Sequence, residues 1–163
     1  MSLVIARARI EAVPEADALI REAADWLNGR GLTLWGPEEL SYDDLVAVAR
    51  AGGLVLARVN SEAVACMYLH NEDRLFWPEC ATGEAFYIHR LAVKRNFAGR
   101  GFARAMLDWA DAETRAQRRK FVRLDCEPRP KLMALYRDAG FAPVDPGPVE
   151  VTGHWVIRQE KRV

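Results

Sequence analysis

The 163-residue sequence has no long apolar run and no excess of charge of either sign, and each absence excludes a class of protein. A membrane-spanning helix needs roughly twenty apolar residues, whereas the apolar start of the chain already contains Arg7 and Arg9. We therefore expect neither membrane insertion nor export. Lys plus Arg and Asp plus Glu number 23 each, so no general attraction to nucleic acid or anionic lipid is predicted.

Cysteine is scarce as well. Cys66, Cys80 and Cys126 are an odd number and show no CxxC spacing. A disulfide framework needs paired cysteines and a structural zinc site needs closely spaced ligands, so neither is predicted. Free thiols are typical of a reducing compartment. We expect a cytoplasmic protein that requires no metal.

What the sequence does contain is typical of a globular protein, with half of the residues apolar and 28% charged. The length suits a single domain over residues 1–163, which can bury a core without disulfides. Ser41 followed by Asp44 resembles a helix N-cap, and Gly52 with Gly53 a helix stop. The patterns predict strands at 3–10, 54–59, 63–70, 84–93, 121–127 and 154–159, a loop at 71–83, and helices at 14–29, 41–51, 99–119 and 130–139.

The segment from Glu84 to Glu127 reads as strand, helix and strand, and it determines the expected sheet. A crossover of this length joins parallel strands. The two short strands on either side of Asn60 have instead the pattern of an antiparallel hairpin. We therefore predict a mixed α+β (α/β) fold, with a central, mostly antiparallel sheet, one parallel strand-helix-strand crossover, and helices on both faces.

Two glycines, Gly99 and Gly101, lie where the long helix is expected to begin. The first turn of a helix presents N–H groups and the positive end of the helix dipole, so glycine there lets a phosphate approach the backbone. The same glycines would also suit a tight turn without a ligand. A GxGxxG dinucleotide fingerprint is excluded because Arg104 stands where its third glycine belongs, and the Gly-Lys-Ser/Thr end of a P-loop is absent.

The order and spacing of these segments resemble the GNAT superfamily of N-acetyltransferases. The matching runs are Arg90-Leu91-Ala92-Val93, Gly99-Arg100-Gly101-Phe102-Ala103 and Leu135-Tyr136-Arg137-Asp138-Ala139-Gly140-Phe141. The family's phosphate motif, Q/R-x-x-G-x-G/A, falls on residues 98 to 103. The resemblance implies a GNAT fold that moves an acetyl group from acetyl-CoA to a primary amine of a small molecule or peptide, by direct transfer in a ternary complex.

The resemblance also implies a set of coenzyme-binding residues. Backbone groups of the Leu-Ala-Val strand would pair with the pantetheine arm, and an amide near Leu91 would polarise the thioester carbonyl. Two positions depart from the family: Ala98 replaces a Gln or Arg, for which Arg95 or Arg100 would substitute, and Arg129 replaces an asparagine. The implied cofactor-binding residues are Leu91, Ala92, Val93, Ala98, Gly99, Arg100, Gly101, Phe102, Ala103, Arg104 and Arg129.

Three residues are candidates for catalysis. Tyr136 lies where the family places a general acid, and a phenol that is neutral at physiological pH can protonate a departing thiolate. His89 is the first candidate for the base that takes the amine proton, because it lies two residues before Leu91 and imidazole titrates near neutrality. Glu84 is the reserve candidate. A packed helix tyrosine and a half-buried strand histidine are the structural alternatives.

Two other functions stay open at this point. The departures at Ala98 and Arg129 also suit a CoA-binding sensor or structural module of the same fold that has lost acetyl transfer. A small nucleic-acid-binding domain would use the basic end of the long helix, but the balanced charge disfavours it. The resemblance adds a possible homodimer, and the sequence does not identify the acceptor amine.

Overall fold

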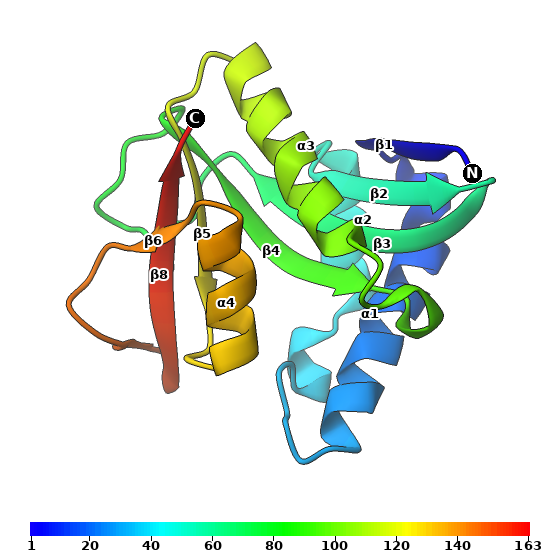
Figure 1. The fold of residues 1–163 in the computed structure, drawn as a ribbon, viewed down its shortest axis with the longest axis horizontal. Coiled ribbons are helices and arrows are strands. Elements are labelled where there is room, and N and C mark those ends of the chain that lie inside the picture. Colours follow the sequence, from blue (N-terminus) through cyan, green and yellow to red (C-terminus); the bar gives the residue numbers. More distant parts are fainter. The chain divides into compact units, whose positions relative to one another are not determined.

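The computed structural model describes residues 1–163 and confirms most of the expected elements (Figure 1). Its helices are α1 (Val13–Asn28), α2 (Tyr42–Arg50), α3 (Phe102–Ala116) and α4 (Pro130–Asp138). Its strands are β1 (Leu3–Arg7), β2 (Leu54–Val59), β3 (Glu62–His70), β4 (Ala85–Val93), β5 (Phe121–Cys126), β6 (Ala142–Pro143), β7 (Val149–Val151) and β8 (His154–Arg162).

The differences from the prediction lie mainly at the ends of elements. The first strand stops at Arg7, and a turn of 3₁₀ helix forms at Ile10–Ala12. The long helix begins at Phe102 rather than at Gly99, because Gly99 and Gly101 have positive φ angles that a helix does not allow. The short strand β7 was not expected among the prolines; it pairs only with β8, and an edge position is where a strand tolerates neighbouring proline.

The sheet confirms the predicted topology. Its strands are hydrogen-bonded in the order β1-β2-β3-β4-β5-β8-β6, with β7 paired to β8. The β4–β5 pair is parallel, from Ala85 opposite Phe121 to Ile88 opposite Leu124. The β1–β2, β2–β3, β5–β8, β6–β8 and β7–β8 pairs are antiparallel. The parallel pair is the one that α3 connects, as the crossover rule requires.

The chain forms two compact units, and the path of the backbone passes between them more than once. The first unit is Met1–Tyr68 with Arg90–Met106, and the second is Leu69–His89 with Leu107–Val163. That residues 1–163 behave as one domain stays a prediction.

In the first unit, α1 and α2 bury their apolar sides against β2 and β3. Ser41 caps α2 as predicted, since its Oγ accepts a hydrogen bond from the Asp44 amide at 3.2 Å. The core residues recur at helical spacing in α1, which is why that segment folds as an amphipathic helix. They are Val13, Ala16, Leu19 and Ile20 of α1, Leu45 and Ala49 of α2, Leu54 and Leu56 of β2, Ala63 and Cys66 of β3, and Ala92 of β4.

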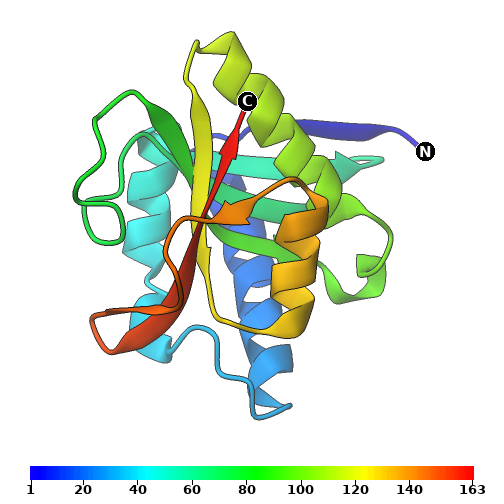
Figure 2. The ribbon, with the colours of Figure 1, turned by 60° about the vertical axis from the view of Figure 1, so that its left-hand side comes forward.

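In the second unit, β5 and β8 run side by side and α4 lies beside them (Figure 2). Trp77, from the loop at 71–83, is buried against Ala85 and Tyr87 of β4. Cys126 at the end of β5 lies 3.8 Å from the sulfur of Met133 on α4. Burial raises the pKa of the Cys126 thiol to about 11, so it is a packing residue rather than a nucleophile.

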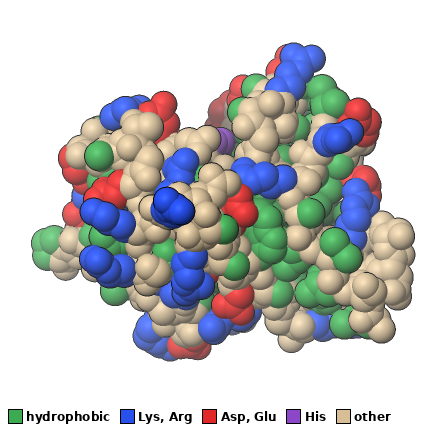
Figure 3. Space-filling model, turned by 90° about the horizontal axis from the view of Figure 1, so that it is seen from above, with side chains coloured by type: hydrophobic (Ala, Val, Ile, Leu, Met, Phe, Trp, Pro, Cys, Tyr) green, Lys and Arg blue, Asp and Glu red, His purple; other side chains and the backbone are tan.

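The surface carries both signs of charge close together. In the view of Figure 3, acidic and basic side chains alternate and neither forms a continuous field. This arrangement agrees with the equal numbers of acidic and basic residues in the sequence. None of the helices combines the length and the apolar character that a membrane crossing requires.

Candidate active site

The turn before α3 has the geometry of an anion cradle. Gly99 and Gly101 have φ angles of 75° and 84°, and a side chain built at either position would have no non-adjacent atom within 4 Å. The Ala105 amide donates to the Gly101 carbonyl at 3.0 Å. The amides of residues 102 to 104 therefore belong to the first helical turn, before the hydrogen bond from Ala105 to Gly101. Open space beside a helix N-terminus fits the pyrophosphate that the sequence predicts there.

Two basic side chains near this turn, Arg95 and Arg100, differ in whether they are free to contact an anion there. The guanidinium of Arg95 lies 3.6 Å from the centre of the Trp26 ring, and the Arg95 amide donates to Glu22 at 2.9 Å. Arg95 is therefore anchored to α1. Arg100 is exposed, with its guanidinium 5.4 Å from the Phe97 ring. Of the two substitutes considered for Ala98, Arg100 is the better placed.

The strand β4 changes character after its first half. Its pairing with β5 ends at Ile88, and Arg90 has a φ of 53°, a left-handed conformation that interrupts the pleat. Because of this interruption, simple strand alternation does not relate Tyr87 and His89 to Leu91 and Val93, which follow it. Leu91 to Val93, to which the resemblance assigns the pantetheine arm, lie beyond the last β4–β5 pair.

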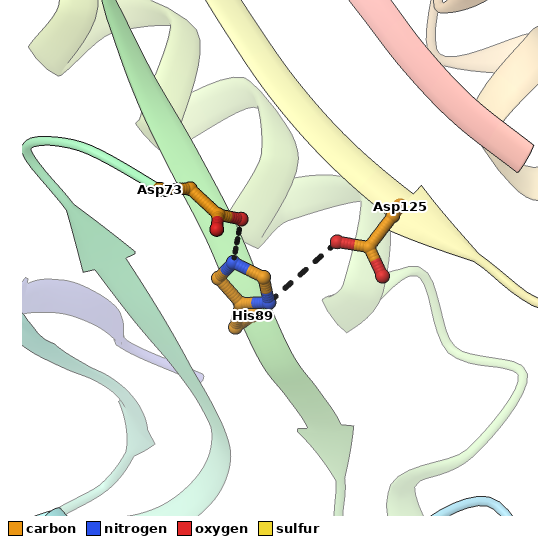
Figure 4. A group of neighbouring side chains, drawn as sticks. All are labelled: Asp73, His89 and Asp125. Atoms are coloured by element: carbon orange, nitrogen blue, oxygen red, sulfur yellow. Dashed lines mark hydrogen bonds and ion pairs between the residues drawn. The ribbon is translucent and has the colours of Figure 1, made fainter. Parts of the chain in front are cut away.

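His89 stands between two carboxylates (Figure 4). Its Nε2 lies 2.8 Å from Asp73 Oδ2, and its Nδ1 lies 3.8 Å from Asp125 Oδ1. Asp73 comes from the loop after β3, His89 from β4 and Asp125 from the end of β5. One ligand atom from each lies within 4.8 Å of the other two, so the group could in principle hold a cation. Of these three residues, only His89 was a candidate from the sequence.

Asp73 is hydrogen-bonded to the backbone of its own loop, residues 71–83. Asp73 Oδ1 accepts from the amides of Leu75 at 3.2 Å and Phe76 at 3.0 Å, which leaves Oδ2 for His89. Burial alone would raise the pKa of Asp73, but the hydrogen bonds from His89 and from these amides outweigh it and lower the pKa below its usual value. Asp73 is therefore an ionised hydrogen-bond acceptor at neutral pH.

Arg158 of β8 anchors the same loop from its other end. Its guanidinium makes two bonds to the Asp145 carboxylate, at 2.8 and 2.9 Å. It also donates to the Phe76 carbonyl at 3.0 Å and to Glu79 at 2.6 Å. The loop that carries Asp73 is thus connected to β8 through the side chain of Arg158.

Glu84, the reserve base, is engaged elsewhere. It accepts from Arg123 at 3.0 Å, and the same guanidinium contacts Glu160 at 2.7 Å and the Tyr87 hydroxyl at 3.0 Å. Arg123 is 5% exposed, so its charge depends on these partners. Glu84 precedes β4, so the pleat of that strand does not fix the direction of its side chain. This environment favours a structural role for Glu84.

Tyr136 is a buried residue of α4, 8% exposed. Its ring packs edge-on against Phe141 with centroids 6.0 Å apart. Burial, and then the nearby Cys126 and Asp125 side chains, raise the pKa of the Tyr136 phenol well above its usual value. The phenol is therefore protonated at neutral pH, the state that a general acid needs. Arg129 precedes α4 and pairs with Glu127 at 2.5 Å.

Comparison with known proteins identifies the family. A model of the acetyltransferase (GNAT) family matches residues 16–141. The chain belongs to the GNAT family. The match includes β4, the glycine turn, α3 and α4, and so covers every segment on which the resemblance was based.

Individual relatives of this GNAT protein agree with the assignment. The uncharacterized N-acetyltransferase YesJ of Bacillus subtilis (strain 168) is 30% identical over 130 residues, which cover 76% of this chain and 72% of YesJ. A GNAT acetyltransferase from Listeria monocytogenes 4b F2365 has the same fold, with a TM-score of 0.82 and 21% identity over 99% of this chain and 95% of the other. PaiA N-acetyltransferase from Thermoplasma acidophilum, solved in complex with coenzyme A, has a TM-score of 0.77 and 16% identity over 100% of both chains.

His70 should make the stability of this GNAT protein depend on pH. Burial, and then the neighbouring His89, lower the pKa of His70 to about 4, against 6.5 for the unperturbed group. As the pH falls from 6.5 towards 4, His70 becomes protonated in the unfolded chain but stays neutral in the folded protein. Folding stability should therefore decrease over this window, by up to about 3 kcal/mol, and then level off.

Urea unfolding at pH 7 and pH 4.5 measures this effect. His70→Gln should remove most of the loss, whereas His154→Gln should not, because His154 is exposed on β8. An equal loss of stability in the wild type and in His70→Gln would contradict the prediction.

Proposed function

We propose that this GNAT protein transfers an acetyl group from acetyl-CoA directly to a primary amine, with both substrates bound together. The observation that carries the proposal is the turn at Gly99 and Gly101, whose positive φ angles and open surroundings leave the start of α3 accessible to a diphosphate. The coenzyme A bound by the Thermoplasma relative supports the same choice of coenzyme.

Coenzyme binding is assigned to residues of the first unit. The backbone of residues 99 to 104 and the exposed Arg100 would hold the pyrophosphate. The backbone of Leu91, Ala92 and Val93, beyond the end of the β4–β5 pairing, would bind the pantetheine arm. The Leu91 amide would donate to the thioester oxygen and stabilise the negative charge that develops there during attack.

Acid and base chemistry is assigned to residues of the second unit. An ammonium has no lone pair, so His89 would take a proton from the acceptor before the amine attacks. Tyr136 would give its proton to the CoA sulfur as the carbon–sulfur bond breaks. Its raised pKa keeps that proton available at neutral pH. Glu84, bound to Arg123, is left as a structural residue in this proposal.

Thermal stability with added nucleotides tests the coenzyme assignment. Acetyl-CoA and CoA at about one hundred times their Kd should each stabilise the fold by roughly 2.7 kcal/mol, and NAD should not. Release of free CoA thiol with a panel of primary amines then tests transfer. Stabilisation without thiol release would identify a CoA-binding sensor, and no stabilisation would refute the proposed function. The homodimer and the cytoplasmic location stay predictions.

A further inference from the structure

We propose that Asp73 is a positioning residue, which holds His89 in the tautomer that accepts a proton from a cationic acceptor amine, while Asp125 faces the accepting nitrogen. This inference rests on the proposed function, since it names the substrate class and the proton path of the same site. It concerns two carboxylates that neither the family motif nor the sequence pattern singles out.

The tautomer follows from the two oxygens of Asp73. Oδ1 is occupied by the amides of Leu75 and Phe76, and Oδ2 lies 2.8 Å from His89 Nε2. An ionised carboxylate can only accept hydrogen bonds. The hydrogen of a neutral His89 must therefore be on Nε2, and the lone pair must be on Nδ1, the nitrogen that faces Asp125.

The distance between Nδ1 and Asp125 suits a third group between them. At 3.8 Å the two atoms are too far apart for a direct hydrogen bond, but both can bond to one nitrogen that lies to the side of the line joining them, about 2.9 Å from each. The His89 side chain is 24% exposed and so within reach of a ligand, whereas Asp125 is 12% exposed and its Oδ1 atom is buried. Ionised Asp73 and Asp125 carboxylates make the site negative. A negative site binds a charged ammonium in preference to a neutral amine.

A metal ion is a less fitting occupant than an amine. An ion bound by both carboxylates could take only one ring nitrogen of His89, and it would have to replace the hydrogen bond between Asp73 Oδ2 and His89 Nε2. The Nε2 side is closed by a hydrogen bond of ordinary length to Asp73. The arrangement is that of a carboxylate orienting an imidazole for proton transfer.

Acetyl transfer from acetyl-CoA to an ammonium releases one proton in total. The acceptor ammonium gives one proton to His89 Nδ1 and so regains the lone pair that forms the nitrogen–carbon bond. The carbon–sulfur bond breaks, and the sulfur keeps its electron pair. Tyr136 gives its proton to that sulfur, and the second proton that the nitrogen loses restores the phenol. The net products are the amide, the CoA thiol and one proton, which leaves for solvent through His89. No oxidant or metal is needed.

Asp73→Asn is the decisive variant. The two backbone amides still require an acceptor, so the oxygen of the new amide should take the Oδ1 position and its NH₂ group should face Nε2. His89 must then accept at Nε2 and carry its hydrogen on Nδ1. We expect turnover to fall on the order of a hundredfold, with the affinity for CoA unchanged.

Asp125→Asn is the matched control, because it removes the same charge from the other side of the ring. It should leave the Nε2–H tautomer in place. It should also raise KM for alkylamines, which are charged at neutral pH, by about tenfold relative to arylamines, which are not. Long-range ¹H–¹⁵N spectra of the labelled full-length protein in alkaline buffer report the tautomer, with His89→Ala identifying the signals.

The outcomes separate this inference from the proposed function. A wild-type His89 in the Nδ1–H form, or no change of tautomer in Asp73→Asn, overturns the inference even if amines are acetylated. Loss of acetyl-CoA binding or of thiol release in the wild type overturns the function, whatever the tautomer. Equal turnover of wild type and Asp73→Asn would reduce Asp73 to a purely structural residue, and stabilisation by Zn²⁺ or Mn²⁺ that both Asp variants abolish would favour a metal site instead.

Discussion

Replacing Gly101 with alanine is expected to weaken CoA binding by about two orders of magnitude, or about 3 kcal/mol. Gly101 has a φ of 84° at the start of α3, and the direction of its missing side chain is open. A methyl group there would occupy the space proposed for the pyrophosphate and hold it away from the helix amides. Isothermal titration with CoA measures the change directly.

The control for backbone strain is Gly52→Ala. Gly52 has a φ of 77° and equally open surroundings, but it follows α2 and lies outside the glycine turn. Both variants should lose about 1 kcal/mol of stability from forcing alanine to a positive φ. Only Gly101→Ala should lose CoA affinity. Equal CoA affinity in the two variants would show that the start of α3 does not bind the diphosphate.

Removal of the Tyr136 hydroxyl is expected to cause a similarly large loss, in this case of turnover. Tyr136→Phe should lower turnover on the order of a hundredfold, because the departing sulfur loses its proton donor. CoA affinity should stay the same, and the ring should keep its edge-on contact with Phe141. Because burial raises the pKa of the phenol, the wild-type residue stays protonated into mildly alkaline solution. Single-turnover kinetics with saturating acetyl-CoA isolate the chemical step.

A second buried tyrosine provides the matched control. The Tyr87 hydroxyl accepts a hydrogen bond from Arg123 at 3.0 Å, so Tyr87→Phe should cost about 1 kcal/mol of stability without slowing acetyl transfer. If Tyr136→Phe turns over at the wild-type rate while chemistry limits that rate, the general acid is a different group.

The parts of the site that could be predicted from sequence are those whose chemistry is local. Gly99 and Gly101 adjoin the helix that they precede, and the strand Leu91 to Val93 leads directly into that turn. Short-range rules of helix starts and strand-helix crossovers therefore sufficed to place the glycine turn and the strand that precedes it. The same rules placed the N-cap at Ser41 and the parallel pairing of β4 with β5.

The surroundings of His89 depend on contacts that no local rule describes. Asp73 lies 16 residues before the histidine in a loop without periodicity, and Asp125 lies on a strand that follows the whole of α3. Glu84 was a plausible base by position alone, but Arg123, which engages it, is 39 residues away. A sequence shows which residues carry chemistry, whereas the pairing of charges between distant segments is set by the folded sheet.

The contacts of Arg158 extend the surroundings of His89, the proposed base, to a distant part of the second unit. Asp145 holds Arg158, Arg158 holds the loop at Phe76 and Glu79, and that loop orients Asp73 against His89. A substitution of Asp145, which precedes β7, is therefore expected to change the orientation of the His89 ring without direct contact to it. Mutant libraries for new acceptors should accordingly include position 145, although Asp145 bonds to Arg158 rather than to His89.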